Sequence, residues 1–230
     1  MIRAIIFDFD GLILDTELPD YTAWNEIYHE YGADIPLSVW AGVIGGKMSD
    51  NGFDPIRYLQ EQSGQTVADV EALQTRRHAR EMELIADQSA LPGIERLIGE
   101  ARQSGLKLAI ASSSSRRWVT GHLERLGLLA QFDVIKTSDD VAVTKPAPDL
   151  FLAALEALGI NADEAVVLED SPNGIAAAKR AGIRAIAVPN TLTRQLDLSQ
   201  ADARFETLAD VSLAQLLDGR RSSRVAGLVE

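Results

Sequence analysis

The feature of this sequence that most constrains its fold is a helix–glycine–strand pattern, which recurs four times between residues 95 and 189. Each predicted helix ends next to a glycine, the residue that most readily adopts the left-handed conformation of helix C-termini. Each is followed by a near-continuous apolar run, as expected for a strand buried on both faces. The helix and strand pairs are Glu95–Ser104 with Leu106–Ala111, Arg116–Leu126 with Phe132–Lys136, Asp149–Leu158 with Ala165–Leu168, and Asn173–Ala181 with Ala185–Pro189. This alternation predicts an α/β fold with a parallel sheet, in which Ile2–Phe7 is the first strand.

The segment 16–87 does not follow this pattern and contains no comparable apolar strand run. Its aromatic residues recur at spacings of three and four, as one face of a helix requires. They are Tyr21, Trp24, Tyr28 and Tyr31. Two further helices are predicted over 55–61 and 67–85. We therefore expect an α/β core of residues 1–15 and 88–220, with residues 16–87 inserted as an α-helical cap over the strand ends.

Composition and charge exclude several classes of protein. The 230-residue chain has no cysteine, which excludes disulfides, zinc thiolates and a thiol nucleophile. Its formal net charge of −12 disfavours nucleic acid as a partner. The sequence has neither an apolar run of the roughly 18–20 residues that span a bilayer nor the layout of a signal peptide. We expect a cytoplasmic monomer that binds neither nucleic acid nor membranes.

Two carboxylates, Asp8 and Asp10, directly follow the first predicted strand, and Gly11 then permits a tight turn. Carboxylates at the end of a buried strand are costly to bring together unless a cation or a reaction requires them. A surface turn capped by an aspartate is the simpler alternative, and it explains one carboxylate better than two.

Polar residues also follow three other predicted strands: Ser112 to Ser115, Lys145, and the pair Glu169 and Asp170. Taken singly, the serines and the acidic pair could merely cap helices, and the lysine could be a solvated charge. In an open α/β sheet, however, ligands bind outside the carboxyl ends of the strands, where all of these residues fall. Carboxylate oxygens suit Mg²⁺, which would also reduce the repulsion between clustered carboxylates and a phosphate.

In this order, Asp8-Phe9-Asp10-Gly11, Ser112, Lys145-Pro146 and Glu169-Asp170 resemble the four motifs of the haloacid dehalogenase superfamily. More narrowly, the chain resembles the β-phosphoglucomutase-like phosphatases of that superfamily, which carry a helical cap between the first two motifs. The resemblance extends over residues 1–218. It implies a Rossmann-like parallel sheet with strand order 5-4-1-2-3, helices on both faces and the inserted cap. It also implies dependence on Mg²⁺.

The resemblance assigns a role to each motif residue. Asp8 is the expected nucleophile that forms an aspartyl-phosphate, and Asp10 the acid and base. Ser112 and Lys145 are expected to hold the transferring phosphoryl group, with help from Ser113. The implied metal ligands are Asp8, the backbone carbonyl of Asp10, Asp170, and Glu169 either directly or by supporting the other ligands.

In the cap, the resemblance makes Lys47 and Arg77 candidates for contacting the distal part of the substrate, although both could equally be solvated charges. The aromatic stripe is expected to form the cap core rather than a platform for a sugar. The histidines show no metal-ligand spacing, and no catalytic role is predicted for them: His29, His78 and His122.

The favoured function is a Mg²⁺-dependent phosphatase acting on a small phosphorylated metabolite, such as a sugar phosphate. The first alternative is a sugar phosphomutase of the β-phosphoglucomutase type. Such mutases place a histidine five residues after the position of Asp15, where this chain has Asp20, and this difference favours water as the acceptor. Two alternatives are weaker. A phosphorylated signalling domain is about half this length, and a dinucleotide-binding domain would have a Gly-x-Gly-x-x-Gly run after the first strand.

Overall fold

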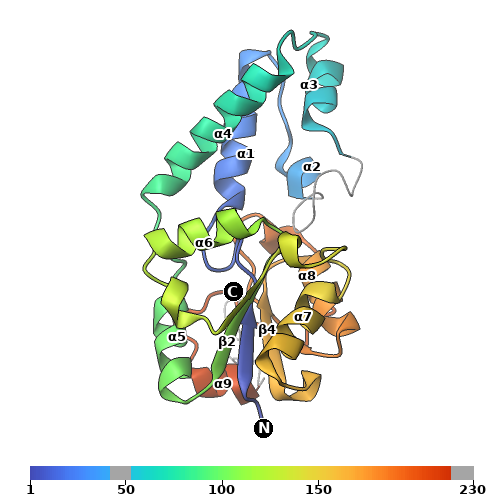
Figure 1. Cartoon of the computed structure of the whole chain (residues 1–230). Coiled ribbons are helices and arrows are strands. Elements are labelled where there is room, and N and C mark those ends of the chain that lie inside the picture. Colours follow the sequence, from blue (N-terminus) through green and yellow to red (C-terminus); the bar gives the residue numbers. More distant parts are fainter. Residues whose placement is uncertain (42–52, 219–230) are drawn as a thin grey trace, which may run out of the picture.

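The computed structural model describes residues 1–41 and 53–218 (Figure 1). In this part of the chain a parallel sheet has six strands in the order β3-β2-β1-β4-β5-β6. The strands are β1 (Ala4–Phe7), β2 (Lys107–Ala111), β3 (Val134–Lys136), β4 (Ala165–Glu169), β5 (Arg184–Ala187) and β6 (Ala203–Arg204). The predicted order 5-4-1-2-3 is thereby confirmed. The edge strand β6 was not predicted, because two residues carry no apolar run.

Helices cover both faces of the sheet. The core helices are α5 (Ile94–Gln103), α6 (Arg116–Arg125), α7 (Asp149–Leu158), α8 (Pro172–Arg180) and α9 (Leu213–Asp218). Alternate residues of β1 face opposite sides, so Ile5 and Phe7 pack with α5, α6 and α9, whereas Ala4 and Ile6 pack with α7 and α8. Short 3-10 turns lie at Leu129–Gln131, Ser138–Asp140, Ala162–Glu164 and Thr193–Gln195. The predicted α/β class with helices on both faces is confirmed.

Within the described ranges, four helices stand beyond the carboxyl ends of the strands, at the end of the molecule opposite the N-terminus (Figure 1). They are α1 (Glu17–Glu30), α2 (Leu37–Ala41), α3 (Pro55–Ser63) and α4 (Val70–Ala86). They share a hydrophobic cluster that includes Trp24, Tyr28 and Trp40, so the aromatic stripe is the core of this helical layer, as predicted. Leu192, from the loop after β5, packs into the same cluster and connects it to the α/β core. The exact cap boundaries, 16 and 87, stay a prediction.

None of the helices in the described residues is both long and apolar enough to cross a membrane.

Candidate active site

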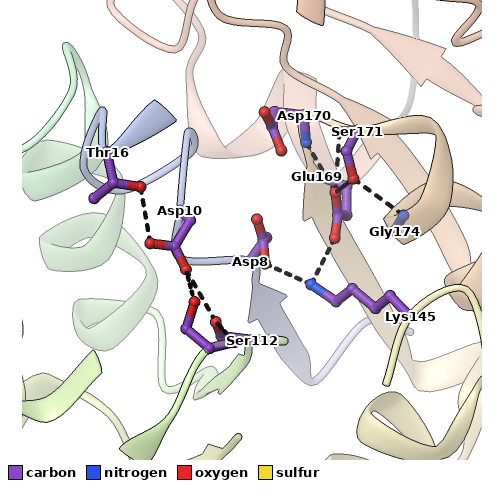
Figure 2. Close-up of polar contacts among 10 residues, drawn as sticks. Asp8, Asp10, Thr16, Ser112, Lys145, Glu169, Asp170, Ser171 and Gly174 are labelled. Atoms are coloured by element: carbon purple, nitrogen blue, oxygen red, sulfur yellow. Dashed lines mark hydrogen bonds and ion pairs between the residues drawn. The ribbon is translucent and has the colours of Figure 1, made fainter. Parts of the chain in front are cut away.

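The turn after β1 places Asp8 and Asp10 at the carboxyl end of the sheet (Figure 2), the end beyond which α1–α4 stand (Figure 1). Gly11 has a φ of 78°, a left-handed conformation that side chains rarely permit. A Cβ atom at this position would lie 2.5 Å from Asn190 Nδ2 and 2.6 Å from the Asp170 carboxylate. Position 11 therefore requires glycine both for its backbone conformation and for this close approach.

Lys145 lies buried between two carboxylates and joins the ends of two strands (Figure 2). Its Nζ donates to Asp8 Oδ1 at 2.5 Å and to Glu169 Oε1 at 2.7 Å. Burial opposes the charge of the lysine, but both carboxylates favour it, and the net effect is a raised pKa of Lys145. Lys145 is thus a fixed cation beside Asp8 rather than the solvated surface charge of the alternative reading.

Glu169 is fully buried, and donors surround its carboxylate. Oε1 accepts from Lys145, while Oε2 accepts from the backbone N–H groups of Asp170 and Ser171 at 3.1 Å and from the Ser171 hydroxyl at 3.0 Å. Helix α8 also lies close to the Glu169 carboxylate, because a Cβ atom at Gly174 would lie 1.7 Å from Oε1. The carboxylate of Glu169 is therefore fixed, and it orients Lys145.

Asp170 differs from Glu169, because one of its oxygens is free. Oδ2 accepts from Asn190 Nδ2 at 2.8 Å, but the buried Oδ1 has no hydrogen-bond partner in the described part of the chain. Burial is the main cause that raises the pKa of Asp170 well above its usual range. A buried carboxylate oxygen without a donor is unfavourable by itself and suits a cation.

Asp8, Glu169 and Asp170 each place one carboxylate oxygen within 4.8 Å of the others. Burial, and next the charge of Glu169, raise the pKa of Asp8 to about 8 despite the opposing effect of Lys145. One lysine faces three carboxylates here, so a divalent cation would balance the charge. These three residues therefore form a buried acidic cluster of the kind that can hold a metal ion, and their role as ligands stays a prediction.

Asn190, on the loop after β5, links three oxygens around this cluster. Its Nδ2 donates to Asp170 Oδ2, to Glu17 Oε2 at 3.0 Å and to the Gly11 carbonyl at 3.2 Å. Glu17 is the first residue of α1, and burial is the main cause that raises its pKa well above its usual range. The helical layer therefore contributes a fifth carboxyl group to the site.

The Asp10 carboxylate points away from Lys145 and accepts hydrogen bonds from four described side chains. Oδ1 accepts from the Thr16 hydroxyl at 2.8 Å and from Trp118 Nε1 at 2.7 Å. Oδ2 accepts from the hydroxyls of Ser114 at 2.6 Å and Ser112 at 3.2 Å. Ser112 therefore bridges Asp10 and the end of β2. The buried hydroxyl of the neighbouring Ser113 has no partner within the residues that the structure describes.

A cavity of about 390 Å³ connects these groups with the helical layer. The predicted core site residues all line it: Asp8, Asp10, Ser112, Ser113, Lys145, Glu169 and Asp170. Arg77 lines its far wall, where it forms an ion pair with Asp20 of α1 and donates to Glu81 at 2.8 Å. The Arg77 side chain is 17% exposed, so it is a paired, largely buried charge. Lys47 lies outside the described residues.

Sequence reasoning did not identify Thr16, Glu17, Trp118 or Asn190 as site residues. A positional signal existed for Trp118, which lies in the first turn of a helix that begins at a strand end carrying four serines. Asn190 follows the end of β5 by three residues, at the same edge of the sheet. Both residue types are ordinary, however, and only the folded chain shows that Trp118 donates to Asp10 and that Asn190 donates to Glu17 and Asp170.

Residues 5–188 match the family model of the haloacid dehalogenase-like hydrolases, which is most of the chain. The chain belongs to this family. It is 47% identical to YhcW of Bacillus subtilis, a protein provisionally named a phosphatase, over 95% of this chain and 97% of that one. It is 30% identical to a phosphorylated carbohydrates phosphatase of Thermotoga maritima, over 80% and 83% of the two chains.

Among solved structures, the chain resembles CbbY from Rhodobacter sphaeroides in complex with phosphate. The TM-score is 0.75 at 33% sequence identity, over 94% of this chain and 99% of that one. The predicted family and the predicted enzyme class, a phosphoric monoester hydrolase of the haloacid dehalogenase type, are confirmed by these comparisons.

Proposed function

We propose that this enzyme is a Mg²⁺-dependent phosphatase that hydrolyses a small sugar phosphate-like metabolite through an aspartyl-phosphate on Asp8. The observation that carries the proposal is the position of Asp8, which lies beside Lys145 and Asp170 in the cavity that also contains Asp10 and the serines. The named activity of the Thermotoga relative supports a sugar phosphate as the substrate class, and the phosphate bound to CbbY supports binding of a phosphoryl group.

The donor set fits magnesium, a hard cation that prefers carboxylate and carbonyl oxygens. Asp170 offers a buried oxygen without a donor, and Asp8 lies next to it. Asp8 and Asp170 would hold the ion together with the backbone carbonyl of Asp10. Both carboxylate oxygens of Glu169 accept hydrogen bonds, from four donors in all. We therefore assign Glu169 to positioning Lys145 rather than to direct ligation of the ion. When bound, the ion reduces the repulsion between the carboxylates and the phosphate.

In the first step, a carboxylate oxygen of Asp8 attacks the phosphorus in line, and the bond from phosphorus to the ester oxygen breaks. Lys145 and the hydroxyls of Ser112 and Ser113 hold the phosphoryl oxygens, where charge is spread in the transition state. Asp10 gives its proton to the leaving oxygen, and the alcohol departs. The phosphoryl group is then bound covalently to Asp8.

In the second step, Asp10 is a carboxylate again and removes a proton from water as the water attacks the phosphorus. Inorganic phosphate leaves and Asp8 is restored. Dividing one difficult displacement into two easier ones is the usual advantage of a covalent intermediate. Asp10 serves both steps because it stands beside Asp8 without pairing with Lys145.

The experiment that tests this proposal compares wild type with Asp8→Asn on a panel of sugar phosphates and on p-nitrophenyl phosphate. We expect Asp8→Asn to lose at least about 10³-fold in kcat, because the amide cannot act as the nucleophile. A chelator should abolish wild-type activity and added Mg²⁺ should restore it. The melting curve of the variant serves as the control for folding. Full activity in Asp8→Asn would overturn the covalent mechanism, and full activity with chelator would overturn the metal requirement.

A phosphomutase remains the second candidate, and the acceptor of the phosphoryl group decides between them. Asp20 occupies the position where mutases of this type carry a histidine, and it is engaged with Arg77 across the cavity. Glucose 1-phosphate distinguishes the two reactions. We expect release of inorganic phosphate, whereas accumulation of glucose 6-phosphate would identify a mutase.

A further inference from the structure

Trp118 lies at the junction of the α/β core and the helical layer, with contacts to both. It lies in the first turn of α6, where the capping residue Ser115 accepts a hydrogen bond from its backbone N–H at 3.3 Å. Its ring packs edge-on against His122 one turn later, with the centroids 4.4 Å apart, and also faces His78 of α4 at 6.3 Å. This packing aims the indole N–H at Asp10 Oδ1, which it reaches at 2.7 Å.

The four donors to Asp10 are not equivalent. A hydroxyl can donate or accept, so Ser112, Ser114 and Thr16 can turn to suit either protonation state of the carboxyl group. The indole N–H can only donate. The indole hydrogen therefore occupies one lone pair of Oδ1 whether or not Asp10 is protonated, and the hydroxyls can accept the proton of the carboxyl group. The indole is thus the donor, among these four, that holds the carboxyl group in the same orientation in both protonation states.

We propose that Trp118 is a positioning residue for proton transfer at Asp10. The indole fixes the orientation of the carboxyl group that gives its proton to the leaving oxygen. This inference rests on the proposed function, in which Asp10 protonates the leaving group. In that step the bond from Asp8 to phosphorus forms and the ester bond breaks with its electron pair on the leaving oxygen. The proton moves from the Asp10 carboxyl group to that oxygen, which leaves as an alcohol.

The test compares two substrates whose leaving groups differ in their need for a proton. A sugar alkoxide is a strong base that must be protonated as it leaves, whereas p-nitrophenolate leaves without a proton. Trp118→Phe keeps the ring and its packing but removes the N–H. For a sugar phosphate we expect kcat/KM, which reports the first irreversible step, to fall about tenfold or more. For p-nitrophenyl phosphate it should stay within about twofold, because a general acid contributes little there.

Two further variants separate a positioning role from a structural one. In an Asp10→Asn background, Trp118→Phe should not slow formation of the phosphoryl-enzyme further, as measured by rapid quench with the sugar phosphate. Trp24→Phe makes the same exchange in the cluster of the helical layer, and it should change kcat/KM for both substrates by the same factor. If Trp118→Phe fails to fold, Trp118→Leu is measured with the same pair of substrates.

Equal losses on both substrates, no loss on either, or a further loss in the Asp10→Asn background would each overturn the role of Trp118. The proposed function fails on a different result, namely activity that survives Asp8→Asn or a wild type that hydrolyses no sugar phosphate. The two failures are therefore distinguishable in one set of proteins.

Discussion

At the scale of single residues, Gly174 shows how closely the backbone must approach a buried charge at this site. It lies in the first turn of α8, directly against the Glu169 carboxylate that orients Lys145. A methyl group there would occupy the position of the carboxylate itself. The need for glycine at position 174 therefore comes from contact with Glu169, whereas Gly11 is needed for its left-handed backbone as well.

Gly174→Ala should displace Glu169 and lower the free energy of unfolding by about 1–3 kcal/mol or more, because overpacking at a rigid site forces its neighbours to move. The displaced Glu169 would also leave Lys145 misplaced, so kcat should fall. Urea unfolding and the phosphatase assay measure the two effects.

The matched control is Gly99→Ala, a helix-interior glycine of α5. An added Cβ there meets nothing within 4 Å in the described residues, apart from its chain neighbours and its own helix backbone. It should raise the stability by about 0.5–1 kcal/mol, since alanine favours the helix over glycine. Equal effects of the two substitutions would contradict the close contact at Gly174.

At the scale of elements, ion pairs join α1 to α4, and they differ in burial. Arg77 lies between Asp20 and Glu81, with a side chain that is 17% exposed. Arg80 joins the same two helices through Glu26, but its side chain is 41% exposed. A buried guanidinium between two carboxylates matters more for stability than an exposed pair, because removing it leaves charges out of contact with water.

Arg77→Met should therefore lower the free energy of unfolding by about 2 kcal/mol or more. Arg80→Met, on the same helix, should lower it much less, because its exposed ion pair is screened by water. Thermal or urea unfolding of both variants measures the difference. If the two variants are equally stable, Arg77 is not a structural ion pair, and its contact with substrate becomes the better explanation for its position.

Asp20 adds a pH dependence to this contact. Burial, opposed by Arg77, raises the pKa of Asp20 to about 6, above its usual value near 4. The folded protein therefore binds more protons than the unfolded chain between about pH 4 and pH 6, and the contribution of Asp20 to stability falls as the pH rises through this window. Asp20→Asn should flatten the stability profile there, which urea unfolding at several pH values measures. An unchanged profile would contradict the raised pKa.

The elements that the sequence predicts best are those whose signals are local. The helix Asp149–Leu158 was predicted with both of its ends, because proline precedes it and glycine follows it. Asp8, Lys145 and Asp170 could be placed together because the carboxyl ends of parallel strands meet at one edge. The bonds from Trp118 and Asn190 could not be predicted. The bond from Trp118 to Asp10 spans 108 positions of the chain and that from Asn190 to Gly11 spans 179. Their geometry depends on the packing of α6 and of the loop after β5.

At the scale of the whole molecule, a chain with a net charge of −12 gathers acidic groups in its interior. The metal-free protein holds Asp8, Asp170 and Glu17 with raised pKa values, chiefly through burial. In the folded state these groups bind protons that the unfolded chain releases above about pH 4. Their contribution to metal-free stability therefore decreases as the pH rises toward the folded pKa of Asp8, about 8.

Magnesium should reverse this trend, because a cation replaces the protons on its ligands. We expect the increase in melting temperature caused by Mg²⁺ to be larger at pH 8 than at pH 6, with the apparent Kd falling up to about tenfold per pH unit for one proton released. Asp170→Asn should lose most of the increase. A Mg²⁺ effect that is independent of pH would contradict the raised pKa values.

The monomeric state and the cytoplasmic location expected from the sequence stay predictions.

The side chain of Asn190 has a consequence at this same scale. Its amide nitrogen carries two hydrogens but faces three oxygens, those of Gly11, Glu17 and Asp170. Any cation that draws Asp170 Oδ2 away releases a hydrogen for the other two acceptors, one of which belongs to the first residue of α1. The two amide hydrogens of Asn190 are thus distributed between the residue that follows the strand ending at Glu169 and the helix that begins at Glu17. A change of charge at Asp170 therefore changes the hydrogen bonding of Glu17.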